Sequence, residues 1–163
     1  MAEVDIQVMD VDLSREGQDA LESDAQRLLD HLGEAGSVLS VVVGGDAFIR
    51  PLNRDYRGKD VATDVLSFPQ REGEGARADD PVLGDLVISL ETAARQALEH
   101  DHPVSHELRV LLVHGLLHLL GHDHLEAEEA ARMAAAEGEL LAVLGAGGHS
   151  LVARAHATEG ATG

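Results

Sequence analysis

Three histidines that lie close together in the chain have the spacing of a metal site. Residues 114–124 read HGLLHLLGHDH. On an α-helix, His114 and His118 would differ by about 40° around the axis and by ~6 Å along it, so both imidazoles can reach one ion. Gly121 lets the helix end and the chain turn, and His124 follows that turn. Three protein ligands leave one position for water, which is typical of catalytic zinc sites.

The third ligand has an alternative in His122, which lies four residues after His118 and would share its face on a continued helix. Gly121 favours an earlier helix end and therefore favours His124. Asp123 can either orient a ligand imidazole or act as a turn residue. An unpaired buried imidazole costs roughly 1–3 kcal/mol, so two histidines on an apolar helix indicate metal binding.

The same spacing matches the metzincin peptidase pattern HExxHxxGxxH. In that chemistry the Glu after the first His is the general base. Here Gly115 stands at that position. A metzincin-like peptidase is therefore an alternative that needs a carboxylate brought to the metal from elsewhere in the chain.

The apolar pattern predicts the elements that must position these residues. The expected strands cover residues 4–11, 38–43, 63–68 and 82–90. The expected helices run from Ser14 to Gly33 or Gly36 and then over 47–55 (capped by Asp46), 91–100, 105–120 and 125–144.

These elements indicate an α+β fold: one domain, residues 1–145, with a small mixed sheet of about four strands packed by helices. The helix that carries the histidines is apolar nearly all round, which predicts that it is central and buried. Residues 146–163 contain Gly, Ala and polar side chains and are expected to form a flexible tail.

Length and composition exclude several classes of protein. The chain has 163 residues, a length that fits one domain. It has no cysteine, which excludes a disulfide scaffold, a thiolate zinc site and a Cys nucleophile. The N-terminus is acidic, unlike a signal peptide, and no apolar stretch is long enough to span a membrane. A cytoplasmic protein is expected.

The charge is strongly negative but unevenly distributed. The chain has 12 Lys and Arg against 30 Asp and Glu, a net charge of −18, which alone argues against binding nucleic acid. Residues 50–60 (RPLNRDYRGKD) are an exception, with four cations against two carboxylates. We call this stretch the basic segment, and it is a candidate anion site.

Three blocks of the sequence resemble the YbeY family of bacterial metal-dependent endoribonucleases, which act in ribosomal RNA maturation. HGLLHLLGHDH is similar to the family signature HGxLHLxGyDH. Residues 52–69, LNRDYRGKDVATDVLSFP, resemble LNxxYRxKDxPTDVLSFP, and residues 84–89, GDLVIS, resemble GDIxI. The blocks follow the family's order. Two departures are Ala62, where Pro is usual, and His122, where an aromatic residue is common.

The resemblance implies one zinc ion per chain, bound by His114, His118 and His124. It also implies a catalytic role for Arg57. A guanidinium can hold a phosphate bidentately and stabilise developing charge. The alternative is an ordinary surface Arg paired with Asp55 or Asp60.

Other residues of the second block have weaker assignments. Lys59 is a weaker phosphate contact than Arg57, and Tyr56 can stack on a base or pack structurally. Asp64, Ser67 and Phe68 lie in the same block, where strand packing explains them equally well.

The function expected from the resemblance is hydrolysis of single-stranded RNA in small-subunit ribosomal RNA maturation and ribosome quality control. The implied partners are the small ribosomal subunit, one of its proteins and an Era-type GTPase, and an acidic surface suits a basic ribosomal protein. The alternative is a ribosome-assembly factor with a structural zinc site. A fourth protein ligand such as His122 or Asp123 would favour that alternative, whereas an open position near Arg57 favours an enzyme.

Overall fold

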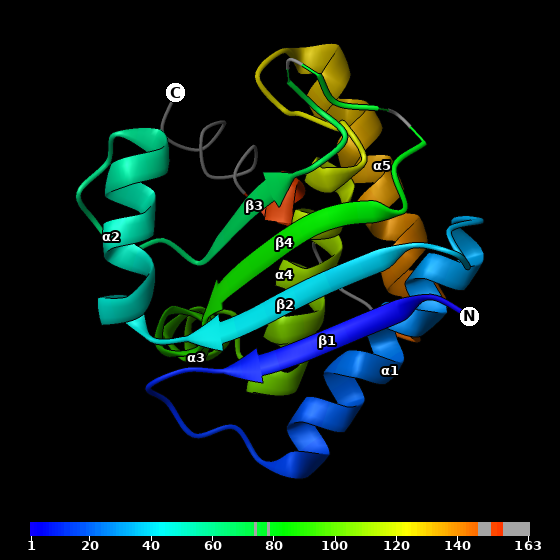
Figure 1. Cartoon of the computed structure of the whole chain (residues 1–163). Coiled ribbons are helices and arrows are strands. Elements are labelled where there is room, and N and C mark those ends of the chain that lie inside the picture. The colour runs from blue at the N-terminus through cyan, green and yellow to red at the C-terminus, as the bar shows by residue number, and fades with distance from the viewer. Residues whose placement is uncertain (74, 78, 147–150, 155–163) are drawn as a thin grey trace.

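The computed structural model describes residues 1–73, 75–77, 79–146 and 151–154. Segments with alternating apolar and polar residues, or rich in β-branched residues, form a mixed sheet (Figure 1). Its strands are β1 (Glu3–Val8), β2 (Val38–Gly44), β3 (Val65–Pro69) and β4 (Val82–Ser89). The spatial order is β1-β2-β4-β3. Strands β1, β2 and β4 run parallel, whereas β3 pairs antiparallel with β4 and forms one edge. The predicted small mixed sheet is therefore confirmed.

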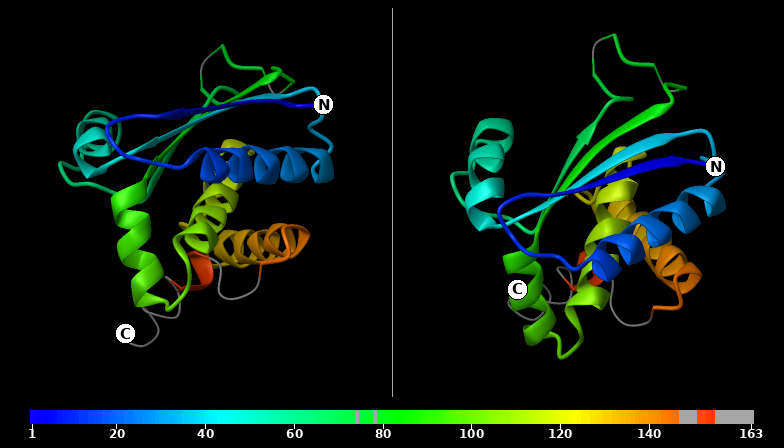
Figure 2. Two further views of the ribbon diagram at one scale, coloured as in Figure 1. Left: turned by 90° about the horizontal axis from the view of Figure 1, so that it is seen from below. Right: turned by 60° about the horizontal axis from the view of Figure 1, so that its bottom comes forward.

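The helices follow the predicted order. They are α1 (Arg15–His31), α2 (Asp46–Arg57), α3 (Leu90–Glu99), α4 (Val104–Leu119) and α5 (Ala127–Val143). Figure 2 shows α1 and α4 below one face of the sheet, with α5 against α4 on the side away from the strands. The α+β fold of a single domain is confirmed.

Side chains of successive strand residues point to opposite faces of the sheet, and this alternation separates two apolar clusters. Leu86 and Ile88 of β4 are buried in the large core between the sheet and helices α1 and α4. Val87 lies between them in sequence and packs instead with Ile49 of α2 and Leu66 of β3. Helix α2 therefore covers the opposite face, and α4 lies between the sheet and α5.

The first residue of α2 differs from the sequence prediction. Gly45 occupies the N-cap position and the helix begins at Asp46, so the prediction of Asp46 as the cap is wrong by one residue. The Asp46 carboxylate instead accepts hydrogen bonds from Ser89 Oγ (2.6 Å) and Thr92 Oγ1 (2.7 Å). An ion pair with Arg95 (2.8 Å) adds to them. These contacts attach the start of α2 to α3.

The C-terminal region is only partly described. Residues 151–154 are helical, and we call them the C-terminal turn. Val152 is 2% exposed. Residues 147–150 and 155–163 of the expected tail lie outside the described residues, and the boundary at residue 145 stays a prediction.

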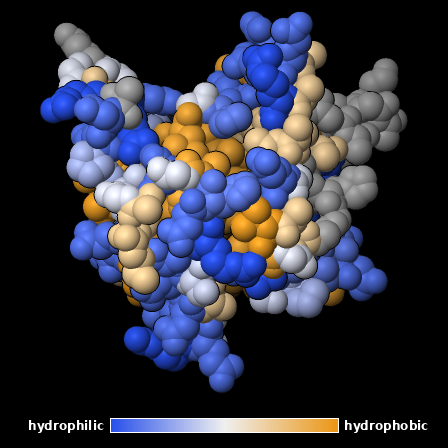
Figure 3. All heavy atoms as spheres, turned by 90° about the vertical axis from the view of Figure 1, so that its right-hand side faces the viewer, coloured by the Kyte–Doolittle hydropathy of each residue, from blue (hydrophilic) through white to orange (hydrophobic). Residues whose placement is uncertain are grey.

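Hydrophilic residues cover much of the surface. On the face in Figure 3 they surround and separate several apolar areas. Among the described residues, no helix is both long enough and apolar enough to cross a membrane.

Candidate metal centre

Helix α4 ends where the sequence predicted. Gly121 has a positive φ of 96°, a conformation that favours glycine. Its N–H donates to the carbonyl of His118 and the N–H of His122 donates to the carbonyl of Leu117, each at 3.0 Å. This pair of bonds is the Schellman motif, which terminates a helix and reverses the chain. The reversal brings His124 back toward the face of α4 that carries the other two histidines.

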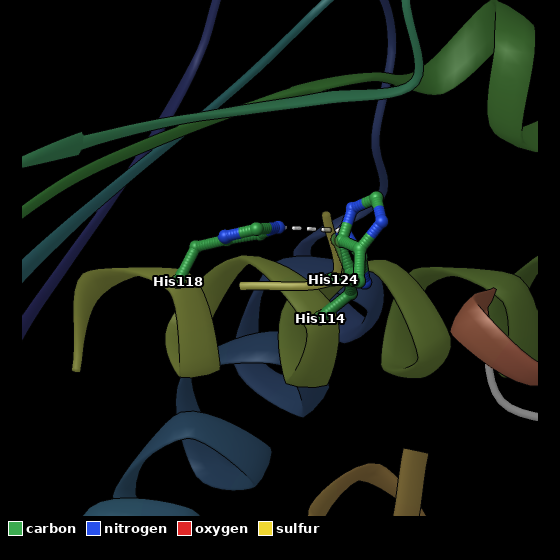
Figure 4. A group of neighbouring side chains, drawn as sticks. All are labelled: His114, His118 and His124. Atoms are coloured by element: carbon green, nitrogen blue, oxygen red, sulfur yellow. Dashed lines mark hydrogen bonds between the residues drawn. The ribbon is translucent and has the colours of Figure 1, made fainter. Parts of the chain in front are cut away.

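The three predicted ligands meet at this point. His114, His118 and His124 each offer a nitrogen, and these atoms all lie within 4.8 Å of one another. Figure 4 shows His114 and His118 pointing toward each other from α4, and their Nε2 atoms are 3.1 Å apart. The ring centroid of His124 is 5.5 Å from that of His114 and 5.4 Å from that of His118.

The neighbours of His124 are not part of this group. His122 is absent from the cluster of potential ligands found among the described residues. The Asp123 carboxylate accepts a hydrogen bond from the backbone N–H of His124 at 2.7 Å. Asp123 is thus engaged as a turn residue, and the cluster consists of three imidazoles.

Burial prepares one imidazole for metal binding. Burial and the nearby His114 and His124 lower the pKa of His118 to about 4. Burial is the larger of these causes, and it lowers the pKa because it disfavours the charged form of the ring. His118 is therefore neutral at physiological pH, which is the form of histidine that binds a metal.

Close packing explains why glycine follows the first ligand. A Cβ atom at Gly115 would lie 2.8 Å from Leu86 and 3.2 Å from Val65, so this position faces the sheet. The Ser67 hydroxyl of β3 also donates to the Gly115 carbonyl at 3.0 Å. A glutamate here would press on the side chains of Leu86 and Val65, so this position disfavours the peptidase base.

A buried carboxylate, which the sequence analysis missed, lies behind the first ligand. Glu137 of α5 is 0% exposed, and its Oε2 lies 3.1 Å from Nδ1 of His114. The available signal was its place in α5, four residues after Met133 and three before Leu140, both of which are buried. A charged residue on an otherwise apolar helix face indicates a specific partner.

The histidines open onto a cavity of about 880 Å³. Residues of α2 and the turn after it, β3, α3, the end of α4 and the C-terminal turn line this cavity. Arg57, Lys59 and Tyr56 are among them, so the fold brings the basic segment and the three histidines to one cavity. Tyr56 is 53% exposed, and its ring centroid is 4.5 Å from that of Phe68.

The ion pairs of the basic segment leave Arg57 available. Asp55 pairs with Arg54 and Asp60 pairs with Arg50, each at 3.0 Å. No hydrogen bond or ion pair of the Arg57 or Lys59 side chain is present among the described residues. The alternative in which Arg57 pairs with Asp55 or Asp60 is therefore wrong.

Asp64, whose role the sequence left open, has structural contacts. One carboxylate oxygen accepts from the N–H of Val65 at 2.8 Å, and the other accepts from Gln96 Nε2 at 3.2 Å. These bonds hold the start of β3 against α3.

Comparison with known proteins places this fold and site in a family. The family described as Endoribonuclease YbeY matches residues 4–145. An Endoribonuclease YbeY of Anaeromyxobacter sp. is 50% identical over 131 residues, which cover 80% of this chain and 67% of that protein. An Endoribonuclease YbeY of Carboxydothermus hydrogenoformans is 51% identical over 117 residues, or 72% of this chain and 78% of the relative.

A solved structure agrees with this assignment. The solution structure of a Thermotoga maritima protein superposes with a TM-score of 0.60 at 25% identity, covering 86% of this chain and 89% of the other. The chain therefore belongs to the Endoribonuclease YbeY family, hydrolases that act on RNA.

Proposed function

We propose that this protein cleaves single-stranded RNA with one zinc ion held by His114, His118 and His124, and that Arg57 is its catalytic arginine. The observation that carries the proposal is the shared cavity. It is lined by three imidazoles and by a guanidinium without an ion pair among the described residues. A phosphodiester carries one negative charge, and a cavity with a metal ion and a free guanidinium suits it.

The three histidines fit a zinc ion. Zinc–nitrogen bonds of about 2.0–2.1 Å place nitrogen ligands of one tetrahedral ion roughly 3.3–3.4 Å apart. Nε2 of His114 and Nε2 of His118 are 3.1 Å apart, so two ligands are already close to this spacing. With three protein ligands and neither His122 nor Asp123 among them, a fourth position remains for water or substrate.

The chain's own residues supply positioning and charge. When bound, zinc supplies Lewis acidity and makes a water molecule more acidic. Arg57 donates to the phosphate oxygens and stabilises the negative charge that develops during cleavage. Burial of His118 keeps its ring neutral at working pH, so the site need not release a proton there before a metal binds.

An exposed aromatic ring at the cavity supports a single-stranded substrate. Bases of unpaired RNA are free to stack on aromatic rings, and Tyr56 is exposed at the cavity. The net charge of −18 predicts weak binding of free RNA by the rest of the surface. We therefore propose delivery by partners: the small ribosomal subunit, one of its basic proteins and an Era-type GTPase, during ribosomal RNA maturation and ribosome quality control in the cytoplasm.

Two alternatives receive less support. A ribosome-assembly factor with a structural zinc would be favoured by a fourth protein ligand, and His122 and Asp123 do not join the cluster. A metzincin-like peptidase would need a carboxylate brought to the metal from elsewhere in the chain, because position 115 is a glycine packed against Leu86 and Val65, and no carboxylate belongs to the three-histidine cluster among the described residues. The enzyme acting on RNA is the proposal that uses Arg57.

The first experiment measures zinc content and cleavage of a labelled single-stranded RNA. The proteins are wild type, His114→Ala, Arg57→Ala and the matched control Arg54→Ala, whose guanidinium pairs with Asp55. We expect one zinc per wild-type chain, loss of zinc and cleavage in His114→Ala, and retained zinc with cleavage reduced about 10²–10³-fold in Arg57→Ala. Arg54→Ala should resemble wild type.

Other outcomes decide between the proposals. Stoichiometric zinc without cleavage above that of His114→Ala would favour the assembly factor. Cleavage unchanged in Arg57→Ala would remove Arg57 from the mechanism. Hydrolysis of casein by the zinc protein would support the peptidase.

A further inference from the structure

Glu137 is an acidic residue that lies fully buried in the protein core. It lies on α5 with 0% exposure, one helical turn from the buried Met133 and Leu140. Burying a carboxylate is unfavourable unless hydrogen bonds and positive charge compensate for the lost water. Among the described residues, its only ion-pair partner is His114.

The two oxygens of Glu137 have different partners. Oε2 lies 3.1 Å from Nδ1 of His114, and Oε1 accepts from the backbone N–H of Val152 at 3.1 Å. A carboxylate group can accept from both partners at once. With its proton on Nδ1, the His114 ring would donate to Oε2, and in the neutral ring Nε2 would keep a lone pair. That Nε2 is the atom that faces His118.

A second buried carboxylate holds the same segment of chain. Glu107 of α4 is also 0% exposed, and its oxygens accept from Nη1 of Arg154 at 2.9 and 3.0 Å. It also lies 2.7 Å from Nε2 of His102. Glu107 and Glu137 thus both bind the C-terminal turn (residues 151–154). Three residues of that turn, Leu151, Val152 and Arg154, line the cavity that contains the histidines.

We propose that Glu137 is a positioning residue for the metal centre and that the C-terminal turn holds it in place through the N–H of Val152. The carboxylate fixes the tautomer and the rotation of the His114 ring, as partners of metal-ligating histidines commonly do. Its negative charge also compensates the charge of a divalent cation that would bind on the other side of the ring. The inference rests on the proposed zinc site, and its experiment separates the two.

The main test is the zinc affinity of the full-length protein, measured by competition with a chromophoric chelator. Glu137→Gln keeps the shape of the side chain but offers one acceptor and one donor group. It cannot accept from both His114 and Val152, so we expect zinc to bind about 10–100-fold more weakly. Glu139→Gln is the matched control, because that side chain is 67% exposed on the same helix, and it should bind zinc like wild type.

A second pair of variants tests the C-terminal turn. Val152→Pro removes the N–H that Glu137 accepts, whereas Val152→Ala keeps the N–H and removes apolar contacts. We expect Val152→Pro to weaken zinc binding several-fold relative to Val152→Ala.

The tautomer of His114 gives a readout that a merely structural role would not change. In apoprotein labelled with ¹⁵N, long-range proton–nitrogen spectra should show the proton of His114 on Nδ1. In Glu137→Gln they should show a mixture of tautomers. Melting curves recorded in parallel identify any variant that has lost its fold, and Val152→Pro then carries the test.

The outcomes separate this inference from the proposed function. If wild type binds one zinc and Glu137→Gln and Val152→Pro bind it equally well, the positioning role is overturned while the metal site stands. If wild type binds no zinc, both are overturned. Weaker zinc binding in folded Glu137→Gln together with a changed His114 tautomer supports the inference.

Discussion

The two walls of the cavity differ in how firmly their side chains are held. The inner wall is the end of α4, where His114 is 7% exposed and packed against His118. The outer wall is the end of α2 and the turn after it, with Tyr56, Arg57 and Lys59. Tyr56 is 53% exposed, and the two cations have no ion pair among the described residues.

This difference matches the ligands that each wall is proposed to bind. A metal ion requires nitrogen atoms placed in advance with small tolerance, which buried and hydrogen-bonded side chains provide. An RNA backbone varies in conformation and is better met by long side chains that keep their freedom and their water until it arrives. Changes in the inner wall should therefore affect metal binding and stability, and changes in the outer wall should affect substrate binding and cleavage but not metal binding.

The largest effect should follow removal of the metal. Dialysis against a chelator should lower RNA cleavage more than about 10³-fold, because the Lewis acid is lost, and added zinc should restore it. The apoprotein should stay folded, since a large apolar core packs α1 and α4 against the sheet. Its melting temperature should fall, because a ligand at a thousand times its Kd stabilises the fold by about 4 kcal/mol.

Cleavage that survives complete removal of zinc would contradict the division into a metal wall and a substrate wall. His31→Ala serves as a control for general loss of histidines, since His31 lies at the end of α1 with its side chain 40% exposed. That variant should keep both zinc and activity.

The next effect tests the packing of the inner wall. In Gly115→Ala the added Cβ would lie 2.8 Å from the side chain of Leu86, which is fully buried, so that side chain or α4 must shift. Overpacking of this kind costs about 1–3 kcal/mol, and we expect a lower free energy of unfolding in urea together with weaker zinc binding, because His114 is the adjacent residue.

Gly138→Ala is the matched control on α5. Nothing lies within 4 Å of a Cβ at that position, and alanine favours helix over glycine by up to about 1 kcal/mol. Gly138→Ala should therefore stabilise the protein. Equal effects of the two substitutions would show that α4 is not packed against the sheet as tightly as described.

The sequence predicted the parts of the molecule that depend on short-range pattern. The order of strands and helices followed from apolar periodicity, and the return of His124 followed from Gly121, whose positive φ ends α4. The error at Asp46 has a local cause: Gly45 takes the cap position, and the carboxylate finds partners in Ser89 and Thr92. Those partners are distant in the sequence, so periodicity does not reveal them.

The rest of the site depends on long-range pairing. Arg57 has no ion pair among the described residues because neighbouring arginines take the two carboxylates of the basic segment, and a sequence does not show which arginine will do so. Glu137 meets His114 only because α5 packs on α4. A resemblance to a family predicted three ligands, whereas the carboxylate beside one of them could be found only from the packing of α5 on α4.

A smaller effect should come from the outer wall. Replacing Tyr56 by Leu keeps apolar contact with Phe68 but removes the aromatic face, so binding of single-stranded RNA should weaken by about 5–10-fold, at the low end of stacking energies. Tyr56→Phe keeps the ring and should bind like wild type. Zinc content should be unchanged in both variants.

The chain itself supplies the probe for this measurement. Tyr56 is its only tyrosine, and it has no tryptophan, so intrinsic fluorescence reports on this one side chain. Short RNA should quench it in wild type if a base stacks on the ring. RNA binding without quenching would place the bases elsewhere in the cavity.

The smallest effect concerns the attachment of the outer wall and depends on pH. Burial raises the pKa of Asp46, but hydrogen bonds from Ser89 and Thr92 and the charge of Arg95 outweigh it and lower the pKa below 3.8. Because the pKa of Asp46 is lower in the folded state, its carboxylate stabilises the fold at any pH above the pKa of the unfolded state. This stabilisation is lost as the pH falls from the pKa of the unfolded state through that of the folded state. Asp46→Asn should therefore cost about 1 kcal/mol in the free energy of unfolding at pH 6. The difference from wild type should shrink below pH ~4. A difference that is constant from pH 6 to pH 3 would mean that the charge of Asp46 does not attach the start of α2, the helix that carries the outer wall, to α3.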